Sequence, residues 1–116
     1  MTVEARLSVE LRPGYHVNSH APAEDYLVPL RLSWEPKPFQ ILEVIYPKPQ
    51  LQSYEFAEKP LSVFTGSFEI VTRLKTPRDA PRGPGILLGK LRYQACTEKL
   101  CLSPRTVEVR LPYEIR

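Results

Sequence analysis

Proline constrains this sequence more than any other residue type, because 13 of its 116 residues are prolines. The usual share of proline in proteins is about 5 %. Proline has a fixed φ angle and no backbone N–H, so it disrupts helix interiors and is confined to edges, first residues and bulges of sheets. The prolines are spread between Pro13 and Pro112. This spacing favours short strands separated by rigid turns.

Apolar and polar side chains alternate in most segments between the turn signals. A period of two residues is the pattern of a half-buried strand. Strands are predicted over residues 3–11, 28–34, 39–46, 68–74, 86–95 and 106–115. No helical stripe of ten or more residues is present. Counting also a bent edge segment within residues 47–60, seven or so short strands with turns between them indicate an all-β sandwich.

Three segments between these strands are predicted to be irregular. Residues 15–23 are polar and contain both histidines. Residues 47–60 are predicted to form a loop or bent edge segment that brings Tyr54 and Phe56 near the surface. Residues 76–85 hold three prolines and two glycines and are expected to form a long connection.

The length of the chain predicts a single domain over residues 1–116. No apolar run approaches the ~20 residues that cross a bilayer. The N-terminus leads directly into the first strand without the pattern of a signal peptide, and this does not decide the compartment.

The net charge of +3 is unevenly distributed along the chain. Residues 1–70 carry six Lys or Arg and nine Asp or Glu, whereas residues 71–116 carry ten and four. The basic residues of the second part alternate with apolar ones, as expected for the solvated face of a sheet. No aromatic RNA-binding signature or helical DNA reader is present, so a nucleic-acid partner is not expected.

The two cysteines, Cys96 and Cys101, lie between two predicted strands that can pair as a hairpin. Facing residues of an antiparallel pair are close enough for a disulfide. A bridge over such a short loop stabilises by only about 2 kcal/mol in the chain-entropy model. An exposed bridge is open to an attacking thiolate, and the neighbouring Lys99 would favour a thiolate here. Spacing alone leaves three possibilities open: thiol–disulfide exchange, a structural bridge, or free thiols or a metal site.

A metal site would need the two histidines as well as the cysteines. His16 and His20 have the i, i+4 spacing that brings ligands together on a helix, but the surrounding prolines and Gly14 disfavour a helix. Both histidines are therefore expected to be surface loop residues, and no metal is expected. The sequence also has no glycine-rich phosphate loop and no nucleophile elbow, so no cofactor is expected.

Three blocks of sequence occur in the order of a known family. They are Gly14–Ser19, Lys59–Gly66 and Leu91–Pro104, the last containing Tyr-Gln-Ala-Cys and Cys-Leu-Ser-Pro. Together they resemble the N-terminal periplasmic domain of the thiol:disulfide interchange protein DsbD, over nearly the whole chain. The resemblance implies an immunoglobulin-like β-sandwich with redox cysteines on a hairpin.

The resemblance also implies roles for individual residues. Cys96 and Cys101 would be the redox pair, with Cys101 forming the mixed disulfide and Cys96 resolving it. Glu55 and Phe56 match a cap loop whose Phe shields the cysteines. Tyr15 matches an aromatic residue that lines the site.

The partners that the resemblance implies are thioredoxin-like proteins and domains, a DsbD-type transmembrane reductase domain and periplasmic disulfide isomerases. The chain would be a domain excised from a longer membrane protein, located in the periplasm. It would relay electrons as part of a protein-disulfide reductase. The alternative is an immunoglobulin-like interaction module in which the hairpin disulfide is purely structural.

Overall fold

The computed structural model describes all 116 residues, and every regular element in it is a β-strand. The ten strands are β1 (Thr2–Glu10), β2 (His16–Asn18), β3 (Arg31–Trp34), β4 (Gln40–Ile45), β5 (Gln50–Gln52), β6 (Leu61–Thr65), β7 (Ser67–Lys75), β8 (Gly83–Tyr93), β9 (Ala95–Cys96) and β10 (Arg105–Ile115). All strand pairs are antiparallel. The structure contains no helix that could span a membrane.

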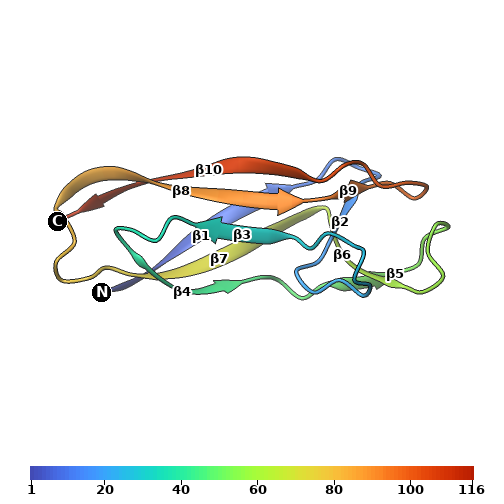
Figure 1. Ribbon diagram of the computed structural model, residues 1–116, viewed down its shortest axis with the longest axis horizontal. Helices are drawn as coiled ribbons and strands as arrows, with labels where there is room; N and C mark the ends of the chain where they lie inside the picture. Colours follow the sequence, from blue (N-terminus) through green and yellow to red (C-terminus); the bar gives the residue numbers. More distant parts are fainter.

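The strands form two layers and an extension at one end. Sheet one has the order β1-β7-β4, and sheet two has the order β10-β8-β3. A four-stranded sheet, β5-β6-β2-β9, here called the end sheet, lies towards one end of the long axis (Figure 1). The molecule measures 52 × 22 × 19 Å. The prediction of an immunoglobulin-like β-sandwich is confirmed.

The main core lies between the layers and draws on all three sheets. Leu32 of sheet two, Ile70 of sheet one and Phe64 of the end sheet belong to one buried cluster. Hydrogen bonds also join the two layers, since Trp34 Nε1 donates to Thr72 Oγ1 over 2.9 Å. Thr72 is fully buried, and this bond satisfies a hydroxyl that would otherwise be costly in the core.

The long strands match the sequence prediction, and β4 contains one irregularity. Its pairing with β7 shifts between Ile41 and Glu43. A bulge of this kind changes which side chains face the core. Strand β3 lies at the edge of sheet two.

The short strands of the end sheet were not predicted as such. β2 lies within residues 15–23, which were expected to be irregular, and all three of its residues are buried. β6 has four consecutive buried residues, Leu61 to Phe64. Strands buried on both faces lose the apolar–polar alternation, and a three-residue strand is too short to display it.

Both chain termini lie at the end of the molecule opposite the end sheet (Figure 1). The loop between β8 and β10, which carries the cysteines, lies at the end-sheet end together with the loop that follows β5 (Figure 1).

Candidate redox site

Cys96 and Cys101 form a disulfide at the tip of the β8–β10 hairpin. The two sulfurs are 2.09 Å apart and the two Cα atoms 3.9 Å apart. Cys96 is completely buried, whereas Cys101 is half-buried. The two cysteines therefore differ in how readily a reagent or a partner protein can reach them.

The predicted hairpin is present and ends in an isolated antiparallel bridge between Cys96 and Cys101, while Cys96 also pairs with a second sheet. β8 and β10 pair up to Tyr93 and Arg105. The chain then crosses at Gln94 into β9, which pairs with β2 of the end sheet. In this pairing Cys96 lies directly opposite His16. The disulfide thus joins an exposed loop to a strand that is fixed in a sheet.

The four residues between the cysteines form a turn organised by Thr97. The Thr97 N–H donates to the Leu100 carbonyl over 2.8 Å. The Thr97 hydroxyl oxygen accepts from the N–H groups of Lys99 and Leu100, each over 3.2 Å. Side-chain bonds of this type hold a local turn in place of regular structure. Lys99 itself is exposed on this turn.

Gln94 braces the far side of the cysteine loop. Its Nε2 donates to the Leu102 carbonyl over 3.2 Å. Its Oε1 accepts from Asn18 Nδ2 and from the Val28 N–H, each over 3.4 Å. The sequence identified Gln94 only as part of a motif, and the structure gives it this bridging position between the cysteine loop, β2 and the segment before β3.

His16 is the largest departure from the sequence prediction, which placed it on a surface loop. Its side chain is only 2 % exposed. Its ring stacks on that of Tyr54, with centroids 4.0 Å apart and an interplanar angle of 17°. Desolvation lowers the pKa of His16 from its ordinary value of 6.5. The expectation fails because β2 is enclosed by β6 and β9. His20, by contrast, is exposed as predicted and stacks on Tyr46.

A chain of hydrogen bonds holds Tyr54 over His16. The Tyr54 hydroxyl donates to Gln52 Oε1 over 2.8 Å, and Gln52 Nε2 donates to Gln50 Oε1 over 3.1 Å. Thr65, which lies opposite His16 in β6, donates to the same Gln50 oxygen over 3.0 Å. Burial first, and then the negative charge of Glu98, raise the pKa of Tyr54. Residues 50, 52 and 54 are two positions apart, and in an extended chain this spacing places their side chains on the same side of the backbone.

An open cleft of about 290 Å³ lies beside this aromatic pair. Its lining includes His16, Tyr54, Glu98 of the cysteine turn, Arg12 and Tyr15. Tyr15 is 37 % exposed. The structure therefore brings Tyr15, which was singled out from the sequence, into one cleft with part of the cysteine turn.

Phe56 and Glu55 lie on the loop that follows β5. The Phe56 ring is 5.7 Å from Tyr54 and 6.4 Å from His16, measured between centroids, and is stacked with both. It is 36 % exposed. Glu55 is exposed on the same loop. Tyr54, which has no predicted role from the sequence, stacks on both His16 and Phe56.

Residues 1–112 match the family described as "Thiol:disulfide interchange protein DsbD, N-terminal". The chain belongs to this family. Family membership and a cysteine pair able to cycle between dithiol and disulfide indicate that the general chemistry of the chain is thiol–disulfide exchange. They also indicate that its partners belong to the general class of thiol–disulfide interchange proteins. No curated protein sequence matches the chain.

The fold of this DsbD N-terminal domain also matches a solved structure. The reduced form of the N-terminal domain of DsbD from Neisseria meningitidis superimposes with a TM-score of 0.61 and 15 % sequence identity. The match covers 96 % of this chain and 81 % of the Neisseria chain. At this identity the likeness concerns the fold.

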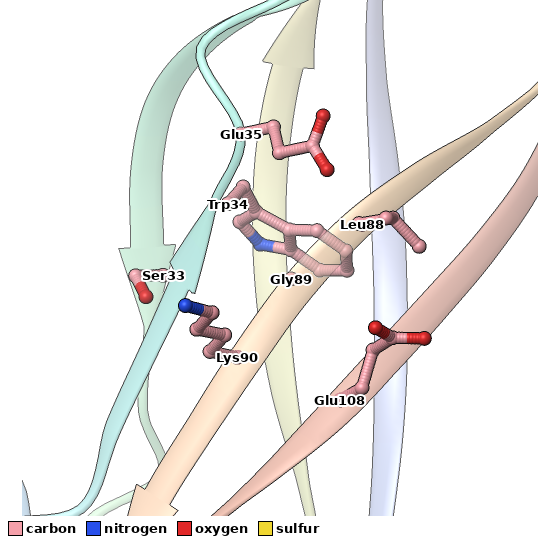
Figure 2. A pocket seen from close by; sticks show the side chains of 7 residues that line it. All are labelled: Ser33, Trp34, Glu35, Leu88, Gly89, Lys90 and Glu108. Carbon is pink, nitrogen blue, oxygen red and sulfur yellow. The ribbon is translucent and has the colours of Figure 1, made fainter.

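A second hollow lies on sheet two, between β3, β8 and β10, and includes neither cysteine. Figure 2 shows the Trp34 indole lying over Gly89, with the charged side chains of Glu35, Lys90 and Glu108 around it. A Cβ at Gly89 would lie 2.7 Å from the indole, so the missing side chain is what makes room for the ring. The hollow follows from this packing.

The structure brings together no group of three or more His, Cys, Asp or Glu side chains that could hold a metal ion.

Proposed function

We propose that this chain is a single-domain electron relay that works through the Cys96–Cys101 pair. A thioredoxin-like domain, itself reduced by a DsbD-type transmembrane reductase domain, would reduce the disulfide. The resulting dithiol would then reduce periplasmic disulfide isomerases and other thioredoxin-like proteins. The observation that carries the proposal is a disulfide on an exposed hairpin tip, in a member of the DsbD N-terminal family.

Cys101 is proposed as the cysteine that forms the mixed disulfide with the partner. Exchange requires in-line access of the attacking thiolate to a sulfur. Cys101 is half-buried on the loop, whereas Cys96 has no exposed surface. Cys96 is then the resolving cysteine, which attacks Cys101 from within the protein and releases the partner.

Single-cysteine variants test this assignment. The full chain carrying Cys96→Ala or Cys101→Ala is reduced and mixed with a thioredoxin-like protein that has a single exposed cysteine, activated as its thionitrobenzoate mixed disulfide. Cys96→Ala is expected to accumulate a mixed disulfide, because the resolving thiol is missing, and Cys101→Ala is expected to form none. Non-reducing electrophoresis and mass measurement read the result. The opposite pattern would exchange the two roles, and no adduct with either variant would contradict the relay.

Phe56 is proposed as a lid that limits access to the reduced thiols, with Glu55 and Tyr15 lining the approach. The support is its stacking on His16, the strand partner of Cys96, within the cluster of aromatic rings formed by His16, Tyr54 and Phe56. An apolar ring in this place would shield the thiols until a partner displaces the loop.

Alkylation of the reduced protein by iodoacetamide tests the lid. Phe56→Ala is expected to speed alkylation several-fold, since the smaller side chain opens the approach to the sulfurs. Ile86→Ala is the matched control, because Ile86 is also an exposed large apolar residue but lies on β8 away from the cysteine loop. Equal rates in Phe56→Ala and the unmodified protein would remove Phe56 from the lid.

A further inference from the structure

The strand pairing places His16 directly opposite Cys96. The two residues are direct partners in the β2–β9 pairing. Directly opposed residues of an antiparallel pair project to the same face of the sheet, with Cβ atoms about 4.5–5.5 Å apart. Cys96 is the cysteine that the proposed function makes the resolving thiol.

The Nε2 atom of His16 is buried and has no hydrogen-bond partner. Buried polar atoms in native proteins are nearly always paired, and an orphan calls for an explanation such as a catalytic role. The structure holds the cysteines in their oxidised form, in which the Cys96 sulfur carries no proton. Reduction creates an S–H donor on the residue that is paired with His16 across the two strands.

The surroundings of His16 favour its neutral form, which can accept a proton. The titratable and charged groups near it are Tyr54, stacked on its ring, and Tyr15, Arg12 and Glu98 in the adjoining cleft. The Tyr54 proton is already donated to Gln52 and does not compete for the imidazole. No carboxylate forms an ion pair with His16 among the salt bridges of the structure, and burial lowers its pKa.

We propose that His16 is the general base that takes the proton of the Cys96 thiol during resolution of the mixed disulfide. This inference rests on the proposed function and assigns a catalytic group to it. From the sequence alone, His16 is expected only as a surface residue or a metal ligand.

The proposed step conserves atoms and electrons. As the Cys96 sulfur attacks the Cys101 sulfur, its proton passes to His16 Nε2. The Cys96–Cys101 bond forms, and the bond between Cys101 and the partner's sulfur breaks. The partner leaves as a thiolate, which is protonated by the imidazolium or by water. The cysteine pair has then lost two electrons and the partner disulfide has gained them.

A two-step reaction with dithiobis(nitrobenzoate) isolates this proton transfer. The reduced full chain releases one thionitrobenzoate when Cys101 attacks the reagent. It releases a second when Cys96 displaces the group from Cys101. The two absorbance phases are followed by stopped flow across a range of pH, so the second phase reports the step assigned to His16.

His16→Phe is the test variant, because a flat ring preserves stacking on Tyr54 and removes the proton acceptor. We expect the first phase to be unchanged. The second phase should slow by about 10-fold or more near neutral pH, because general-base catalysis typically contributes at least this much to a rate. The difference should narrow at high pH, where the Cys96 thiol increasingly ionises without a base. His20→Phe, which replaces the exposed histidine, is the matched control and should leave both phases unchanged.

A second phase with the same rate and pH dependence in His16→Phe as in the unmodified chain would overturn the inference. If His16→Phe does not fold, the pH dependence of the second phase in the unmodified chain still tests the inference. Its second phase should rise with pH as His16 loses its proton, at a pKa below 6.5. A profile that follows only the thiol would overturn the role of His16. Release of a single thionitrobenzoate by the unmodified chain would instead contradict the proposed function itself.

Discussion

His16 is a polar residue that the end sheet buries, although histidines in such a polar segment are usually exposed. Histidine and asparagine alternate with Val17 in β2, a pattern that by itself indicates an exposed segment. The structure buries all three residues. The polar groups are partly satisfied, since Asn18 Nδ2 donates to the Val28 carbonyl over 3.1 Å. Nε2 of His16 and Oδ1 of Asn18 remain unpaired.

The buried neutral state of His16 makes the stability of the protein depend on pH. The pKa of His16 is lowered in the folded state from its ordinary value of 6.5. At pH values between the folded-state pKa and 6.5, the unfolded chain therefore binds more protons than the folded chain. The free energy of unfolding is therefore expected to fall as the pH drops below about 6.5 and to level off below the folded-state pKa. Urea unfolding at a series of pH values measures this dependence.

The control for this prediction is the other histidine. His16→Phe should remove the decrease in stability between about pH 6.5 and the folded-state pKa, whereas His20→Phe should retain it, because His20 is exposed in both states. A decrease of the same size in His16→Phe would assign the effect to other groups.

Strand β8 illustrates how elements are fixed by contacts that a sequence does not display. Two of its glycines lie beneath aromatic rings of neighbouring strands. A Cβ on Gly85 would meet the Tyr113 hydroxyl of β10 at an impossibly short distance, and one on Gly89 would meet Trp34 of β3. These glycines let the rings lie flat across the strand.

Gly89→Ala is expected to destabilise the fold by about 1–3 kcal/mol, the usual cost of overpacking a filled site. The new Cβ would lie 2.7 Å from the indole of Trp34 and 2.9 Å from the Ser33 carbonyl oxygen, which belongs to the backbone of the paired strand and cannot turn aside. Urea unfolding measures the change. Lys90→Ala, on the exposed position next to it, is the control. Equal stability of Gly89→Ala and the unmodified chain would contradict the packing described for β8.

At the level of elements, the sequence was informative wherever one face of a strand meets water. The alternation at β1, β7, β8 and β10 predicted those strands closely, and the turn around the cysteines followed from the two strands that flank it. The end sheet was missed because β6 is buried on both faces and β2 and β9 are very short. The partners of Cys96 were therefore invisible in the sequence, since the β2–β9 pairing joins residues about eighty positions apart.

The whole molecule is a long sandwich with the loop that carries the disulfide at one end and both termini at the other (Figure 1). The disulfide closes a loop of only five residues' separation. In the chain-entropy model such a loop contributes only about 2 kcal/mol, and the hydrogen-bonded turn around Thr97 holds the same loop without it. The bridge is thus expected to open and close while the two sheets stay intact.

The reduction potential of the Cys96–Cys101 disulfide is the most direct test of this account. The full chain is equilibrated in graded thiol buffers and quenched with an alkylating reagent, and the fraction reduced is read by mass. A reversible two-electron transition at about −120 to −270 mV, the range of exchange catalysts, is the predicted result. A bridge that resists reduction to below about −300 mV would be a structural disulfide and would contradict the relay.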